Sequence, residues 1–264
     1  MSAEQPTFDE PSADPCLPRG VVVTGAAAGL GLGIVDVLVE TGHAVVGLDR
    51  DPEVVDVLSA RGEGHHAVVG DATDESVLTE ACERAAELGN GLLAVVLNAG
   101  VTSPGPSVDY PLEEWDRVLD VNLRGAFIGA RVARPFLGAS GSVVMLSSIV
   151  ARQGFAARAS YCASKAGVEG LVRSLAMEWG PDGIRVNAIA PGTIETEMQR
   201  QMIAAGRLSQ GAALQRIPMA RIGKPHDIGN AVEFLISRRS AYITGVVLPV
   251  DGGWAAGGLP STVA

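Results

Sequence analysis

Short apolar runs alternate with amphipathic segments along most of the chain. Seven of the runs are rich in Val, Ile and Leu and are bounded by Gly, Asn or Asp, as is typical of strands covered on both faces. They are GVVVTG (20–25), AVVGLD (44–49), HAVVGD (66–71), LLAVVLNAG (92–100), GSVVMLSS (141–148), IRVNAIAPG (184–192) and GVVLPVDGG (245–253). The intervening pattern predicts helices over 29–42, 73–88, 112–137, 161–180 and 225–237.

This alternation continues from residue 20 to residue 250 and predicts a doubly wound α/β fold. We expect one Rossmann-type domain over 19–264, with a seven-stranded parallel sheet and helices on both faces. Residues 1–18 are rich in Pro and acidic residues and lack the features of a signal peptide, so we expect a disordered tail. Residues 195–217 are polar and weakly patterned, which predicts a substrate flap over the ligand crevice.

Composition narrows the class of protein. Acidic residues outnumber basic ones by 30 to 20, which argues against nucleic acid or an anionic membrane as the partner. There is no unbroken apolar run of 18 residues or more, so no membrane span is predicted. The three cysteines have no metal-ligand spacing, which indicates reduced thiols and no metal site. We therefore expect a cytoplasmic enzyme or binding protein for a small molecule.

Glycines follow the first predicted strand, at the edge of the sheet where ligands of doubly wound folds bind. Gly25, Gly29 and Gly31 lie in VVVTGAAAGLGLG, where missing Cβ atoms let backbone N–H groups and a helix N-terminus approach a pyrophosphate. The spacing differs from G-x-G-x-x-G, so the turn by itself is as compatible with packing as with nucleotide binding.

Asp49 ends the second strand, 20 positions after Gly29. A carboxylate there accepts hydrogen bonds from the adenosine ribose hydroxyls and repels a 2'-phosphate. Arg50 favours such a phosphate, but residues 26–28 supply no basic side chain, so we predict NAD rather than NADP. Asp71 ends the third strand, and it either caps the next helix or hydrogen-bonds the adenine.

Tyr161 precedes Lys165 by four residues in ASYCASKAG, and the chain contains only three tyrosines and two lysines. Residues at i and i+4 share one helix face, so the ammonium can lie near the phenol. A free phenol, with a pKa of about 10, is a poor base at neutral pH. A nearby ammonium, aided by the positive nicotinamide ring of an oxidised cofactor, favours the phenolate and lowers that pKa, so that Tyr161 can take a proton from an alcohol.

Taken in order, these motifs resemble those of the classical short-chain dehydrogenase/reductases over nearly the whole chain, from about 19 to 254. The family's T-G-x3-G-x-G, N-A-G, helix Asn, catalytic Ser, Tyr-x3-Lys and P-G-x-I-x-T positions are occupied by Thr24, Gly25, Gly29, Gly31, Asn98, Ala99, Gly100, Asn122, Ser148, Tyr161, Lys165, Pro191, Gly192, Ile194 and Thr196. Ser148 stands thirteen residues before Tyr161, and the alternation of side chains along a strand makes its neighbour Ser147 the structural hydroxyl.

The resemblance implies a catalytic tetrad of Asn122, Ser148, Tyr161 and Lys165. In it Ser148 holds the substrate oxygen, Lys165 also binds the nicotinamide ribose, and Asn122 holds a water that connects Lys165 to solvent. Asn122 has a second interpretation, in which it satisfies a buried carbonyl. The predicted cofactor site comprises Thr24, Gly25, Gly29, Leu30, Gly31, Asp49, Arg50, Asp71, Ala72, Asn98, Ala99, Gly100, Tyr161, Lys165, Pro191, Gly192, Ile194 and Thr196.

We therefore expect an NAD-dependent oxidoreductase that transfers a hydride between a secondary alcohol or ketone and the cofactor. Two alternatives stay open: an NADPH-dependent 3-oxoacyl-thioester reductase, and a non-catalytic dinucleotide-binding regulatory protein. The family also implies a homotetramer. An apolar or cyclic substrate is suggested by Met198, Met202, Ile203 and Leu208, and an acidic or phosphorylated one by Arg152, Arg158 and Arg200.

Overall fold

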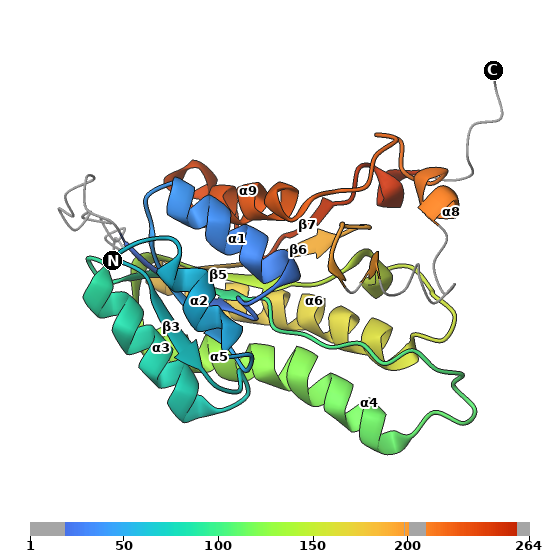
Figure 1. Ribbon diagram of the computed structural model, residues 1–264, viewed down its shortest axis with the longest axis horizontal. Helices are drawn as coiled ribbons and strands as arrows, with labels where there is room; N and C mark the ends of the chain where they lie inside the picture. The colour runs from blue at the N-terminus through green and yellow to red at the C-terminus, as the bar shows by residue number, and fades with distance from the viewer. Residues whose placement is uncertain (1–18, 198, 201–209, 258–264) are drawn as a thin grey trace, which may run out of the picture.

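The computed structural model describes residues 19–197, 199–200 and 210–257. Its seven strands form one parallel sheet in the order β3-β2-β1-β4-β5-β6-β7 (Figure 1). The strands are β1 (Gly20–Thr24), β2 (Ala44–Asp49), β3 (His66–Val69), β4 (Leu92–Leu97), β5 (Leu137–Leu146), β6 (Arg185–Pro191) and β7 (Val247–Val250). The predicted seven-stranded, doubly wound sheet is confirmed. The predicted tail and the four apolar flap residues Met198, Met202, Ile203 and Leu208 lie outside the described residues.

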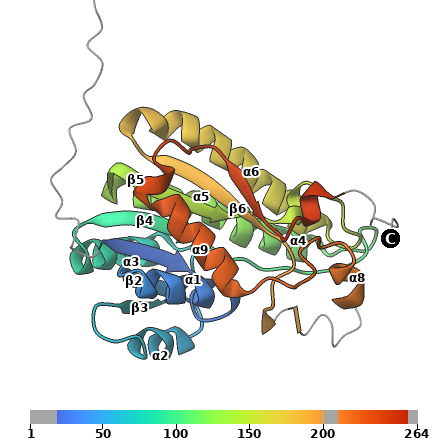
Figure 2. The same ribbon diagram turned by 90° about the horizontal axis from the view of Figure 1, so that it is seen from above.

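Helices cover both faces of the sheet. The helices of the described residues are α1 (Gly29–Glu40), α2 (Glu53–Ser59), α3 (Glu75–Leu88), α4 (Leu112–Leu119), α5 (Gly125–Ala133), α6 (Ala159–Trp179), α8 (Gln210–Leu214) and α9 (Pro225–Ile236). One core joins the sheet to α1, α2 and α9, and α1 and α9 lie side by side on that face (Figures 1 and 2). A second core joins the opposite face to α3, α5 and α6.

The central strands are apolar throughout because both of their faces are buried. All residues of β1 and β4 are buried. Successive side chains of a strand point to opposite faces, and Val21 and Val23 accordingly pack in the core of α1 and α9, whereas Val22 packs in the other. Continuous apolar runs therefore predicted these strands correctly.

The structure corrects two predicted elements and adds two helices, α2 and α8. The predicted helix 112–137 is interrupted by a π-helical turn at Asp120–Arg124, between α4 and α5. Strand β5 ends at Leu146, so the residues that follow it in the predicted strand lie beyond its end. Helix α2 was not predicted, because its one buried pair, Val54 and Leu58, is too short a periodic pattern.

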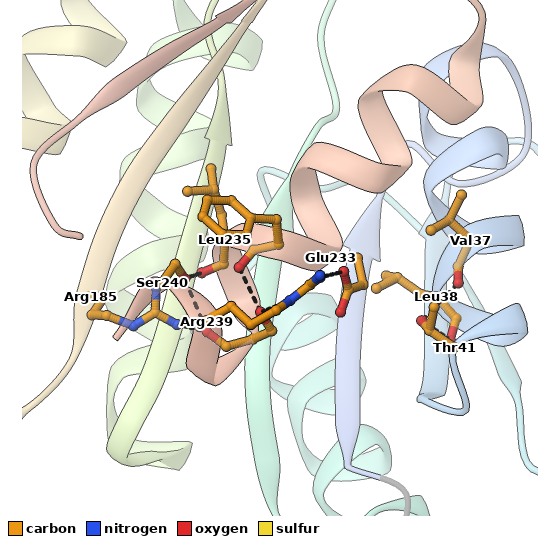
Figure 3. Close-up of polar contacts among 10 residues, drawn as sticks. Val37, Leu38, Thr41, Arg185, Glu233, Leu235, Arg239 and Ser240 are labelled. Atoms are coloured by element: carbon orange, nitrogen blue, oxygen red, sulfur yellow. Dashed lines mark hydrogen bonds and ion pairs between the residues drawn. The ribbon is translucent and has the colours of Figure 1, made fainter. Parts of the chain in front are cut away.

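At the opposite end of β6 from the predicted site, Arg185 joins the sheet to the end of α9 (Figure 3). Its guanidinium is buried and donates to the carbonyl oxygens of Leu235, Ile236 and Ser237 and to Ser240 Oγ, the last at 2.8 Å. The last carbonyls of a helix lack intrahelical partners and carry partial negative charge, so a cation stabilises them. Burial lowers the pKa of Arg185.

Replacement of Arg185 by Lys is expected to lower the free energy of unfolding by about 2 kcal/mol, because an ammonium cannot reproduce a planar fork that meets several carbonyls. Urea denaturation measures the change. Arg84→Lys is the matched control: Arg84 makes an exposed ion pair with Glu87, and its replacement should cost less than about 0.5 kcal/mol. Equal losses in the two variants would contradict the role of the fork.

Candidate active site

The carboxyl ends of the central strands open onto a cavity of about 440 Å³. The order of the strands reverses between β1 and β4, which is where doubly wound sheets bind ligands. Predicted site residues that line this cavity are Gly25, Gly29, Leu30, Asp49, Arg50, Asp71, Ala72, Asn98, Ala99, Gly100, Ser148, Tyr161, Lys165, Pro191, Gly192, Ile194 and Thr196. One cavity therefore brings together most of the predicted cofactor residues and three members of the predicted tetrad.

Thr24 and Gly31 do not line the cavity but shape the turn beside it. Thr24 Oγ1 accepts hydrogen bonds from the backbone N–H groups of Asn98 and Ala99, both at 3.0 Å. A Cβ on Gly31 would lie 1.8 Å from the carbonyl oxygen of Gly25, so the helix can approach the turn only at a glycine. Both residues thus have a structural role in the turn, and their predicted contact with a cofactor stays a prediction.

The glycine turn fits a dinucleotide. Gly25 and Gly29 have φ of +69° and +57°, a backbone conformation that favours glycine. A Cβ on Gly29 would meet nothing closer than 3.7 Å, so the N-terminus of α1 is open toward the cavity. Backbone N–H groups at such a terminus are suited to a pyrophosphate.

Asp49 is held in place at the end of β2. Its Oδ2 accepts from the backbone N–H of Ala27 and its Oδ1 from that of Asp51, both at 3.0 Å. These bonds keep a carboxylate on the cavity wall, where a ribose hydroxyl can donate to it.

Asp71 does not cap the helix that follows it. The cap of α3 is Asp74, which accepts from the backbone N–H of Ser76 at 2.8 Å. Asp71 Oδ1 instead accepts from the backbone N–H and the hydroxyl of Thr73, and these hydrogen bonds help to lower the pKa of Asp71. The capping interpretation was wrong, and the contact with adenine stays a prediction.

Helix α6 carries Tyr161 and Lys165 on one face. Lys165 Nζ lies 5.7 Å from the centre of the Tyr161 ring and donates to the carbonyl oxygen of Leu146 at 2.7 Å. Lys165 is only 4% exposed, and this burial lowers its pKa to about 8. The amine is thus held beside the phenol by the end of β5.

The pKa of Tyr161 is raised, and the expectation that Lys165 and an oxidised nicotinamide ring lower it together stays a prediction. Burial is the dominant cause, and it outweighs the charge of Arg158 and the hydrogen bond with Ser148, both of which lower the pKa. Desolvation penalises the phenolate more strongly than these groups favour it. A raised pKa suits proton donation at neutral pH, whereas proton abstraction requires further positive charge in the cavity.

Asn122 lies in the π-helical turn and is buried. Its Nδ2 donates to the carbonyl oxygen of Val101 at 2.9 Å and to Ser164 Oγ at 3.1 Å, and its Oδ1 accepts from the N–H of Val101 at 2.7 Å. Asn122 thus satisfies the N–H and the carbonyl of the half-buried Val101, which agrees with the second interpretation in that a backbone carbonyl is satisfied. A Cβ on Gly100 would lie 3.2 Å from Asn122 Oδ1 and 3.5 Å from Lys165 Nζ. The water-holding role stays a prediction.

The three arginines that were considered as partners of an acidic or phosphorylated substrate have different contacts in the structure. Arg152 pairs with Glu169, and Arg200 pairs with Glu197. Arg158 donates to Thr102 Oγ1 at 3.0 Å, and its charge acts on Tyr161.

Several cavity residues were not predicted. They are Ala28, Leu48, Gly70, Val101, Val121, Leu146, Ser147 and Glu197. Most of them directly adjoin predicted residues at the ends of strands, so extending each motif by one residue finds them.

Within 19–197, 199–200 and 210–257, no helix is long and apolar enough to cross a membrane. The same ranges contain no group of three or more His, Cys, Asp or Glu that could hold a metal ion, and Cys82 and Cys162 are free thiols.

Comparisons with known proteins extend these observations. A family model described as enoyl-(acyl carrier protein) reductase matches residues 25–255. A 3-oxoacyl-[acyl-carrier-protein] reductase of Thermotoga maritima is 36% identical over 88% of this chain and 96% of its own length. Cis-4-hydroxycyclohexanecarboxylate dehydrogenase of Sinomonas cyclohexanicum is 38% identical over 90% of this chain and 97% of its own length. The chain spans only 43% of another relative, an uncharacterized short-chain type dehydrogenase/reductase of Sinorhizobium fredii.

A crystal structure of a putative 2-deoxy-d-gluconate 3-dehydrogenase from Agrobacterium tumefaciens with bound NADP is similar to this chain, with a TM-score of 0.81 and 37% identity. The match covers 90% of this chain and 97% of that one. The fold, the cavity and these relatives define an oxidoreductase that uses a nicotinamide cofactor. The chain belongs to the short-chain dehydrogenase/reductase family.

Proposed function

We propose that the protein is an NAD-dependent oxidoreductase that interconverts a secondary alcohol and its ketone. The observation that carries this proposal is the single cavity in which Ser148, Tyr161 and Lys165 share walls with the glycine turn and Asp49. A nicotinamide dinucleotide bound there would supply the hydride acceptor or donor and, when oxidised, a positive charge.

Each group of the chain has a distinct task in this proposal. Ser148 donates a hydrogen bond to the substrate oxygen and stabilises the charge that develops on it. Tyr161 takes the proton from the alcohol oxygen, or returns it to the ketone oxygen in the reverse direction. Lys165, held by the carbonyl of Leu146, contributes positive charge beside the phenol and binds the ribose.

The test is a panel of secondary alcohols and diols with NAD, followed by the absorbance of NADH. Turnover of one or more members supports the proposal. Binding of NADH without turnover of any alcohol or ketone would instead support the non-catalytic, regulatory alternative. The homotetramer stays a prediction, which light scattering checks.

Asp49 supports NAD over NADP, because its fixed carboxylate would repel a 2'-phosphate. Replacement by Asn removes the charge but keeps an oxygen for the N–H of Ala27. We expect Asp49→Asn to shift the ratio of kcat/KM for NAD to that for NADP by about 100-fold toward NADP. Steady-state kinetics with both cofactors measure the ratio.

Asp51→Asn is the matched control, because Asp51 is exposed and does not line the cavity. It should leave the ratio unchanged. A wild-type protein that already prefers NADP, or an unchanged ratio in Asp49→Asn, would refute the assignment of NAD.

A second candidate is an NADPH-dependent reductase of 3-oxoacyl thioesters. The Thermotoga maritima relative, the description of the matching family model and the NADP-bound structural neighbour favour it. Arg50 on the cavity wall offers a cation for a 2'-phosphate. Reduction of an acetoacetyl thioester with NADPH, at a higher kcat/KM than any alcohol shows with NAD, would establish this alternative.

A further inference from the structure

A buried carboxylate lies on α6 one helical turn beyond Lys165. The side chain of Glu169 is only 7% exposed, yet it carries a charge that the proposed reaction does not use. Its Oε2 accepts from Arg152 Nε at 2.9 Å, and its Oε1 accepts from Ser147 Oγ at 3.3 Å. Arg173 Nη1 lies 4.0 Å from Oε2. A buried charge is costly unless it is paired, so these partners hold Glu169 in place.

The partners of Glu169 stand on both sides of Ser148. Ser147 remains tied to the sheet, since its N–H donates to the carbonyl oxygen of Ile189 at 2.7 Å. Ser148 then caps a 3-10 turn, and its Oγ accepts from the N–H of Val150 at 3.4 Å. The N–H of Arg152 donates to the carbonyl oxygen of Ile149 at 3.2 Å and closes that turn. One carboxylate on α6 is thus bonded to the residue before Ser148 and to the residue that closes its turn.

The last residue of β5 and the two residues after it contact three successive turns of α6. The carbonyl of Leu146 accepts from Lys165, Ser147 donates to Glu169, and Ser148 is hydrogen-bonded to Tyr161. The exposures of the ion pair differ: the side chain of Arg152 is 55% exposed and that of Glu169 is 7% exposed. Breaking the pair would therefore leave an uncompensated buried charge on Glu169, which belongs to the same helix as Tyr161.

We propose that Glu169 is a positioning residue, which acts through Arg152 and Ser147 to hold the Ser148 turn against α6 and so to set Ser148 beside Tyr161. The inference rests on the proposed function for its effect on rate. Its structural half, the restraint of the turn, is measurable without turnover.

The test compares Glu169→Gln, Arg152→Gln and the double variant with the wild type. Each single variant should lower kcat about tenfold while the KM for NAD changes less than about twofold, because the cofactor contacts lie elsewhere. The double variant should lose no more than either single variant, as expected for residues that act as a unit. Arg152→Lys, which keeps the cation, should recover most of kcat.

Hydrogen exchange provides the readout that does not depend on activity. In Glu169→Gln the amides of residues 149–152 should exchange about tenfold faster, whereas those of β1 and β4 should be unchanged. Arg134→Gln is the control, because it breaks a partly exposed pair with Asp182. It should alter neither kcat nor exchange in the turn.

The outcomes distinguish the two proposals. If the wild type turns over and Glu169→Gln retains its kcat and its local exchange, the positioning role is refuted and the proposed function stands. If the wild type turns over no substrate, the proposed function fails, and exchange alone decides the positioning role. Faster exchange confined to the turn supports it; unchanged exchange, or a rise spread over the whole sheet, refutes it.

Discussion

Tyr161→Phe is expected to lower the rate of alcohol oxidation by at least about 1000-fold, while the Kd for NADH changes by less than about threefold. The substitution removes one hydroxyl and keeps the ring, so the amine of Lys165 retains its contact with Leu146. Proton transfer at the substrate oxygen is lost, whereas the glycine turn and Asp49 are untouched. Single-turnover absorbance measures the rate, and NADH fluorescence measures binding.

Tyr242→Phe is the control, since that ring is fully exposed and its hydroxyl should not matter. A Tyr161→Phe variant that turns over like the wild type would remove Tyr161 from the mechanism.

The pH profile tests the same group. Because burial raises the pKa of Tyr161, its phenolate is scarce at neutral pH, and alcohol oxidation should accelerate as pH rises. Ketone reduction, which needs the protonated phenol, should slow. Lys165 titrates nearby, with a pKa of about 8, so the observed midpoint belongs to the pair. Tyr161→Phe should remove from the residual activity the part of the pH dependence that the phenol contributes.

Gly31→Ala is expected to weaken NADH binding by more than about 100-fold and to lower the free energy of unfolding by about 3 kcal/mol. The new Cβ would lie 1.8 Å from the carbonyl oxygen of Gly25 and 2.8 Å from Asn98 Nδ2. A backbone carbonyl cannot move aside as a flexible side chain can. The glycine turn and α1 must therefore move apart, which changes the shape of the cavity. Fluorescence titration and urea denaturation measure the two effects.

Gly180→Ala is the matched control. Gly180 has a right-handed helical φ of −56°, and a Cβ there would meet nothing within 4 Å. This variant should bind NADH like the wild type and lose little stability. Normal NADH binding by Gly31→Ala would show that the approach of α1 to the turn is not needed.

Local pattern predicted most of the fold because the central strands are buried on both faces. In β1 and β4 every residue is buried, and apolar runs of this kind are visible without any knowledge of their neighbours. The interruption of the predicted helix at Asn122 could not be predicted, because it accompanies a contact with a residue that is remote along the chain. The side chain of Asn122 bonds to the backbone of Val101, 21 positions away, and no helical period contains that contact.

The candidate site divides in the same way. The spacing of Tyr161 and Lys165 places them on one helix face from the sequence alone. The raised pKa of Tyr161 could not be predicted, because it depends on how deeply other segments bury the phenol. The sequence left Arg152 as a possible partner of an acidic substrate. Its pairing with Glu169 is seen only in the folded chain.

The amino-acid sequence by itself determined the seven strands, most of the helices between them and most of the residues that line the cavity. Buried strands, glycine turns and i, i+4 pairs are local features, and the carboxyl ends of parallel strands meet at one edge. The tertiary structure decided which polar groups pair and which charges are penalised. Ion pairing and desolvation depend on segments that are remote along the chain and adjacent only after folding.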